Sequence, residues 1–207
     1  MVCPATTSRR SGFTIMEMLA VVAVIGVTAA LAAPAVHSAR MEAKTNRAAI
    51  EIVRIHRNAR AAALMYGRAH LVRYDSGGRG SFHAYRGIAS NCNANGWGPI
   101  VGGPPCGSAG SYCIDRLDLM DVGWTIGSST IRVSPQPPVA SIDVCYEPSG
   151  RVQWRRGVAA GVGGGFSERN AIGGGMRYEV QRLDMGVAQG VTRIVAVPLG
   201  GEARLIQ

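Results

Sequence analysis

A single carboxylate, Glu17, lies inside the most apolar segment of the chain. It is the only charged residue between positions 13 and 33, so no Lys or Arg of the same segment can neutralise it. An ionised carboxylate at membrane depth costs a few kcal/mol, and such residues usually have a function. We expect Glu17 to find a counter-charge outside its own segment. The alternative is a carboxylate that is merely tolerated near a membrane interface.

Cysteines are the other residues whose number and spacing suggest chemistry. Four of them follow the apolar segment, namely Cys92, Cys106, Cys113 and Cys145. An even number in a domain outside the cytoplasm indicates two disulfides. Four cysteines allow three pairings, and the spacing does not choose among them. We favour Cys92–Cys106 with Cys113–Cys145, because the first bond would close a long loop at residues 91–112.

The remaining polar residues do not form a recognisable catalytic or metal-binding motif. The sequence contains no G-x-S-x-G, H-E-x-x-H, C-x-x-C or P-loop pattern. His37 and His56 fall in the expected helix, whereas His70 and His83 fall in expected strands and are isolated. Asp118 and Asp121 suit an exposed turn. We therefore expect no enzymatic activity, no cofactor and no metal.

The apolar segment is long enough to cross a membrane. Roughly 21 residues at about 1.5 Å each span the roughly 30 Å hydrocarbon core of a bilayer. Arg9 and Arg10 precede it, which places that end in the cytoplasm and the rest of the chain outside. A secretory signal with a cleavage site at residues 29–33 is the alternative. It is disfavoured by the internal carboxylate and by the helical pattern that continues beyond Pro34.

A second helical segment follows the first without a break in phase. Apolar residues recur at three- and four-residue steps from position 35 to position 66, which predicts one buried face. That face contains Met41, Ala48, Ile52, Ile55, Ala59, Ala62 and Tyr66. The basic residues of the segment, from Arg40 to Arg60, occupy other faces and are expected to be solvated. Gly67 is the expected C-cap, so one helix from 13 to 66, kinked near Pro34, is predicted.

The remaining residues, 68–207, suit one small β-rich domain. Short β-type runs separated by turn residues predict an antiparallel arrangement of two sheets, so the fold class is α+β. The runs are 70–75, 81–88, 124–126, 130–133, 142–146, 152–155, 176–182, 192–197 and 203–206, the last two forming a hairpin across 198–201. Glycine-rich segments at 91–112 and 157–175 are expected to be surface loops that carry partner specificity.

The N-terminal string Gly12-Phe13-Thr14-Ile15-Met16-Glu17-Met18-Leu19, with its basic leader, apolar run and Pro34, resembles the prepilin motif. That motif is typical of type IV pilins and type II secretion pseudopilins. In the head, residues 146–152 contain a P-x-G-R turn between two expected strands. This pattern and the hairpin at 193–204 resemble the FimT/GspH type of minor pilin. The long 91–112 segment departs from that pattern.

The resemblance implies a processing pathway and a set of partners. A prepilin peptidase would cut after Gly12, remove the 1–12 leader together with Cys3, and methylate the new amino terminus of Phe13. Glu17 would then pair with the Phe13 amine of a neighbouring subunit, and Pro34 would match the family's mid-helix proline. Residues 13–34 would serve the membrane and the filament, 35–67 the stalk, and 68–207 a periplasmic head. Other pilin subunits and an inner-membrane assembly platform are the implied partners.

The implied role is a minor pilin or pseudopilin in the tip or priming complex of a type IV pilus or a type II secretion pseudopilus. The formal net charge of +9 leaves the head mildly basic, with fourteen basic and ten acidic residues between 68 and 207. A DNA-uptake pilin is therefore one alternative. The candidate phosphate contacts are Arg155, Arg156, Arg177 and Arg204. A single-pass anchored protein that never polymerises is the other alternative.

Overall fold

The computed structural model divides into two compact units, Met1–Arg40 and Met41–Gln207. We describe each by itself, although one helix, α1 (Ile15–Tyr66), contributes to both. The structure describes residues 13–77, 80–119, 129–136, 140–156, 165–166, 175–198 and 202–206. The leader with Gly12, the expected 124–126 strand, Asp121, most of the 157–175 segment and the turn at 199–201 lie outside the described residues.

Helix α1 confirms the expected long helix. It begins two residues after position 13, includes Pro34 and ends at Tyr66. Gly67 follows with φ +64°, and its amide donates to the carbonyl of Ala63 at 3.1 Å. A left-handed residue that satisfies a terminal carbonyl is a common helix ending, and glycine adopts it without strain.

In the second unit, α1 buries one face. Its buried residues recur at steps of three and four, as an amphipathic helix requires. They are Met41, Thr45, Ala48, Ala49, Ile52, Val53, Ile55, His56, Ala59 and Ala63. The prediction was wrong for Tyr66, which is exposed. The buried face of the helix instead continues from Ala59 to Ala63. The ring centre of Tyr66 lies 6.3 Å from that of His70.

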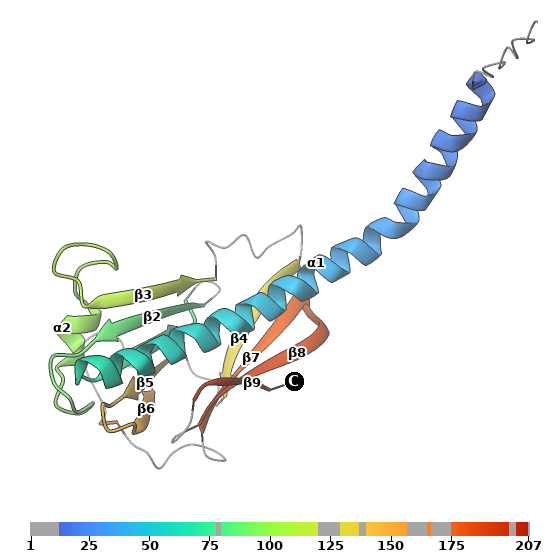
Figure 1. Cartoon of the computed structure of the whole chain (residues 1–207). Helices are drawn as coiled ribbons and strands as arrows, with labels where there is room; N and C mark the ends of the chain where they lie inside the picture. The colour runs from blue at the N-terminus through green and yellow to red at the C-terminus, as the bar shows by residue number, and fades with distance from the viewer. Residues whose placement is uncertain are drawn as a thin grey trace, which may run out of the picture. The chain divides into compact units, whose positions relative to one another are not determined.

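Two antiparallel sheets pack with this helix, as the strand pattern predicted (Figure 1). The first has the order β3-β2-β1-β5-β6 and the second the order β4-β7-β8-β9. The strands of the first sheet are β1 (His70–Asp75), β2 (Ser81–Arg86), β3 (Cys113–Asp118), β5 (Ser141–Tyr146) and β6 (Val152–Arg156). Those of the second are β4 (Ser129–Gln136), β7 (Gly175–Asp184), β8 (Val187–Pro198) and β9 (Arg204–Ile206).

Two elements were not predicted. Strand β3 begins at Cys113 and ends at Asp118, so Asp118 belongs to a strand rather than to a turn. A short helix, α2 (Trp97–Val101), lies within the segment that was expected to be a loop throughout. Both follow residues rich in Gly, Pro and Asn, whose turn preferences obscured them.

One hydrophobic core joins α1 to both sheets. At its centre His56 is completely buried among the rings of Phe82, Tyr146 and Tyr178. Its Nδ1 shares a hydrogen bond of 2.8 Å with the hydroxyl of Tyr146, while its Nε2 has no hydrogen-bond partner. Because burial disfavours the charged imidazolium, the pKa of His56 falls to about 3 from its usual 6.5.

We predict that this histidine makes the head sensitive to acid. Between pH 6.5 and 3 the unfolded chain takes up a proton at His56 that the folded chain excludes. The free energy of unfolding therefore decreases as pH falls through that range, by about 1.4 kcal/mol per pH unit from this group. Denaturant unfolding of the detergent-solubilised chain, followed by tryptophan fluorescence at several pH values, measures the slope.

His56→Gln removes the titration and should flatten this part of the profile. An identical slope in the native chain and His56→Gln would contradict the assignment.

Candidate functional site

In the N-terminal unit, Thr14 caps the first turn of α1. The backbone amide of Glu17 donates to Thr14 Oγ1 at 3.2 Å and approaches the Thr14 carbonyl at 3.1 Å. Thr14 thus acts as N-cap, with Glu17 as the third helical residue, the spacing of a capping box. A negative charge in the first turn also interacts favourably with the helix dipole. Sequence reasoning missed this local role, although the Thr-x-x-Glu spacing was visible.

The helical residues that follow in this unit expose many apolar side chains. The most apolar 18-residue window of α1 has a mean hydropathy of 2.4, and none of it is buried within the protein. Exposed side chains include Phe13, Ile15, Leu19, Val24 and Leu31. The helix is long and apolar enough to cross a membrane. A helix that is apolar all round requires lipid or other protein around it.

Pro34 lies inside α1. A proline lacks the amide hydrogen that would bond to the carbonyl four residues earlier, so this position weakens the helix ladder. One turn and a half before it, Thr28 Oγ1 bonds to the carbonyls of Val24 and Ile25 at 3.0 Å each. The local chemistry is compatible with the expected bend near Pro34, which stays a prediction.

The head contains two disulfides, as expected, but the favoured pairing was wrong. The bonds join Cys92 to Cys145 and Cys106 to Cys113. Cys92 and Cys145 are both fully buried in a second apolar cluster, which brings loop and strand together across 53 residues. Cys106 and Cys113 flank a tight turn, with Cα atoms 4.8 Å apart. Only the tertiary placement of β5 reveals the first pair.

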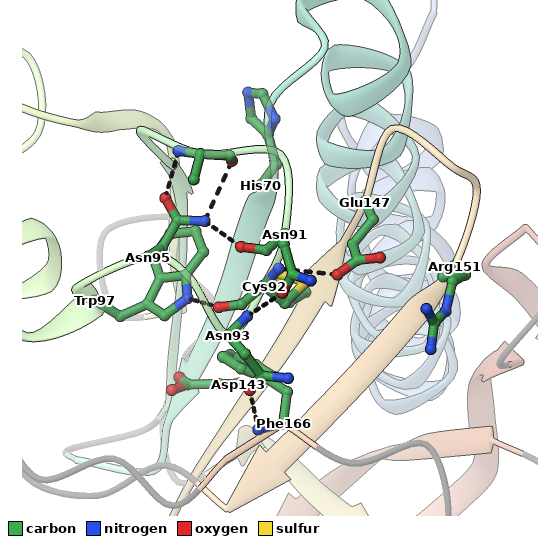
Figure 2. Close-up of a disulfide and its surroundings, with 12 residues drawn as sticks. His70, Asn91, Cys92, Asn93, Asn95, Trp97, Asp143, Glu147, Arg151 and Phe166 are labelled. Carbon is green, nitrogen blue, oxygen red and sulfur yellow. Dashed lines mark hydrogen bonds between the residues drawn. A yellow bond between two sulfur atoms is a disulfide. The ribbon is translucent and has the colours of Figure 1, made fainter.

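The Cys92–Cys145 disulfide fastens a loop rich in asparagine onto the first sheet (Figure 2). Asn95 is buried and uses both ends of its amide, accepting from the backbone amides of Ile88 and Ala89 and donating to the carbonyls of Ala89 and Asn91. The indole of Trp97 donates to the carbonyl of Cys92 at 2.7 Å. These bonds order the loop in detail.

The β5–β6 hairpin, which contains the P-x-G-R pattern, contacts the same loop. Glu147 is buried and its Oε1 accepts from the backbone amide of Cys92 at 2.9 Å (Figure 2). Gly150 turns the hairpin with φ +85°, and its amide donates to the Glu147 carbonyl at 2.9 Å. The hairpin that contains the P-x-G-R pattern therefore stabilises the loop through Glu147.

The four candidate DNA contacts are divided between the two sheets. Arg155 lies in the first sheet, where its Nε donates to the fully buried carboxylate of Asp143 at 2.9 Å. That carboxylate also receives a two-pronged contact from Arg73, at 2.6 and 2.8 Å. The Arg155 guanidinium further lies 4.4 Å from the ring centre of Phe166, a cation–π contact. Arg155 is thus committed to the fold.

The other three candidates are exposed. Arg156 is the last residue of β6. In the second sheet, Arg177 of β7 and Arg204 of β9 both pair with Ala196 of β8, so the two arginines lie on the same exposed face of that sheet. Glu202 forms an ion pair with Arg57 at 2.8 Å and lies close in sequence to Arg204. DNA binding at Arg156, Arg177 and Arg204 stays a prediction.

The histidines of the first sheet have structural environments. Burial lowers the pKa of both His70 and His83. The Nδ1 of His70 also bonds to the Arg68 carbonyl at 3.0 Å. Within the described part of the chain, no three His, Cys, Asp or Glu side chains gather closely enough to hold a metal ion.

Comparison with known proteins adds no relative: no protein-family model, curated protein or solved structure matches this chain. The assignment to a class of proteins therefore depends on the residues and contacts described above.

We predict that the adjacent arginines Arg155 and Arg156 differ sharply in their effect on stability. Arg155→Ala removes one of the two described cationic partners of the buried Asp143 and should lower the free energy of unfolding by about 1–3 kcal/mol. Arg156→Ala, on the exposed end of the same strand, should change it by no more than about 0.5 kcal/mol. Equal effects in denaturant unfolding would contradict the role assigned to Arg155.

The two disulfides should also contribute unequally. In the loop-entropy model, a bond across 53 residues stabilises by about 4 kcal/mol and one across 7 residues by about 2.5 kcal/mol. The double variant Cys92→Ser/Cys145→Ser should therefore unfold at lower denaturant than Cys106→Ser/Cys113→Ser. Peptide mapping without reduction tests the pairing directly, and a Cys92–Cys106 peptide would refute it.

Proposed function

We propose that this chain is a minor pilin or pseudopilin of the FimT/GspH type. In this proposal it is inserted in a bacterial inner membrane with its amino terminus in the cytoplasm and its head in the periplasm. Prepilin peptidase removes residues 1–12 and methylates Phe13. The assembly platform then moves the subunit into the tip or priming complex of a type IV pilus or a type II secretion pseudopilus.

One observation carries the proposal: an exposed helix that is apolar all round begins beside a carboxylate. None of the apolar window is buried by the described residues, and Glu17 is in the first turn of the same helix. A membrane anchor explains the apolar side chains, and helix capping gives the acid a local role, but neither supplies a counter-charge for it. A bundle of identical helices explains both, because a neighbouring Phe13 amine can neutralise Glu17 in a setting that lipid or protein keeps dry.

The head supports the same proposal. The second half of α1 lies in a core shared with two sheets. One continuous helix therefore provides both the exposed apolar segment and part of the core of the head. Two disulfides suit an oxidising compartment such as the periplasm. The mechanism we propose is mechanical: α1 leaves the bilayer and packs against the equivalent helices of other subunits, while the head stays folded.

We predict that the mature chain begins at N-methyl-Phe13. Intact-mass and N-terminal peptide mass spectrometry of the protein extracted from membranes should find a chain shortened by residues 1–12 and carrying one added methyl group. Replacing Gly12 with Val places a branched side chain at the cleaved bond and should leave the leader attached. A full-length chain, or one cut within residues 29–33, would remove the proposal in favour of a plain anchor or a secreted protein.

Cells that express the chain also allow the role of Glu17 in filament assembly to be tested. Glu17→Ala leaves the proposed neighbouring amine without its counter-charge and should reduce the chain recovered in sheared filaments about tenfold or more. Glu202→Ala, which removes an exposed acid of the head, serves as the matched control. Normal recovery of Glu17→Ala would contradict the pairing.

A further inference from the structure

The C-terminal end of α1 exposes apolar side chains on the head. Leu64, Met65 and Tyr66 are the last three residues of the helix, and they are between 54% and 76% exposed. Ile88, in the loop that follows β2, is 56% exposed. Single exposed apolar residues are normal on a protein surface, whereas a contiguous group of them usually marks an interaction site.

Backbone hydrogen bonds bring the loop that contains Ile88 to the end of the helix. The amide of Ala69 donates to the carbonyl of Ala89, and the amide of Gly87 donates to the carbonyl of Ala69, both at 2.8 Å. Ile88 therefore lies between two residues that bond to Ala69, which itself follows Tyr66 by three positions. The four exposed apolar residues thus belong to one end of the head.

The position of Ile88 is fixed by the loop around it. Its amide and that of Ala89 donate to Asn95 Oδ1 at 2.6 and 2.8 Å, and Figure 2 shows Asn95 bonded to the backbone of this loop. A Cβ atom on Gly87 would lie 2.7 Å from both Asn95 Oδ1 and the carbonyl oxygen of Ala69, so the packing there requires glycine. An exposed side chain on an ordered loop loses little conformational entropy when a partner covers it.

Two exposed arginines accompany these apolar side chains. Arg68 follows the helix end, and Arg86 pairs with His70 in the register of β1 and β2. The ring centre of His70 lies 6.3 Å from that of Tyr66. No described acidic side chain forms an ion pair with either arginine. The helix dipole contributes roughly half a unit of negative charge at this end, so the local charge remains positive.

We propose that the terminal patch docks an acidic segment of another protein, in which Asp or Glu residues flank apolar side chains. The terminal patch is defined as Leu64, Met65, Tyr66, Arg68, Arg86 and Ile88. The apolar side chains of the partner would cover those of the patch, while its carboxylates would accept paired hydrogen bonds from the guanidinium groups. Tyr, Met and Arg are enriched in such interfaces. The inference concerns the head alone and does not depend on the processing or the filament proposed above.

Three other occupants fit the terminal patch less well. A symmetric contact with a second copy would bring Arg68 and Arg86 of both copies together, and like charges repel. A nucleic acid would use the arginines, but Leu64, Met65 and Ile88 provide no ring on which a base could stack. An anionic bilayer attracts each arginine only through a screened charge, without the directional pairing that a carboxylate in a protein interface provides.

Site-specific photocrosslinking of the full chain tests the proposal in the cells from which it originates. A photoreactive amino acid replaces Met65 or Ile88 in the terminal patch. The matched control replaces Val187, an equally apolar and exposed residue of the second sheet. Mass spectrometry then identifies the molecule attached to each site and, for a protein, the peptide that carries the crosslink.

We expect both patch sites to attach to the same acidic segment of one other protein, and the Val187 site not to do so. Arg68→Glu/Arg86→Glu should reduce that adduct about tenfold, because the carboxylates of the partner would then meet like charges. Arg68→Lys/Arg86→Lys should retain part of it, since the charge stays and the paired hydrogen bonds are lost. Arg47→Glu, at an exposed position elsewhere on α1, should leave it unchanged.

Several results would overturn the proposal. They are the absence of any adduct at the patch sites, an adduct with a second copy of the chain, with lipid or with nucleic acid, and a crosslinked segment without acidic residues. An adduct that survives Arg68→Glu/Arg86→Glu unchanged would also exclude the assigned role of the arginines. Peptide mapping of the two disulfides in each variant shows that the head has kept its fold.

Discussion

The rest of this structure depends on a helix whose apolar surface the described residues leave exposed. The 18-residue window of highest hydropathy has no buried residue, whereas the same helix buries ten residues further along. Hydrophobic burial is the main favourable term in folding, and leaving so much apolar surface uncovered has no benefit in water. An exposed apolar helix of this length is suited to lipid or to other helices around it.

The second half of α1 shows how the head makes use of that same element. Small residues, Ala48, Ala59 and Ala63, alternate with larger ones along its buried face, which lets two sheets approach the helix closely. His56 then carries a polar group into the centre, where Tyr146 satisfies one nitrogen and burial keeps the ring neutral. Since the helix is part of the core, it cannot be withdrawn without unfolding the head.

Sequence patterns predicted the regular elements well. Helical periodicity and the Gly67 cap indicated α1 to within two residues at its beginning and correctly at its end, and alternating β-branched runs indicated eight of the strands that the structure describes. Strand β3 was missed because its sequence, CIDRLD, alternates weakly and follows a stretch of turn-forming residues. Helix α2 includes Gly98 and Pro99 and is too short to show periodicity.

Contacts between distant residues were the part that sequence could not supply. The pairing of Cys92 with Cys145 follows from β5 lying beside β1 beneath the asparagine-rich loop, an arrangement that spacing alone does not encode. Arg155 looked like a free basic residue because its partner, Asp143, faces it only once β5 and β6 pair in register. The register likewise places Arg73 on the other side of Asp143.

The capping role of Thr14 leaves the carboxylate of Glu17 open for a second task. The cap uses the Glu17 backbone amide as donor and Thr14 Oγ1 as acceptor, so it occupies neither oxygen of the side chain. The helix dipole lessens the cost of the negative charge in the first turn without replacing a counter-ion. Capping alone does not require a charge, since the third position of a capping box takes glutamine as well as glutamate. The charge of Glu17 thus still calls for a partner. In the assembly that we propose, the amine that cleavage would expose on Phe13 of a neighbouring subunit would have the right sign to be that partner.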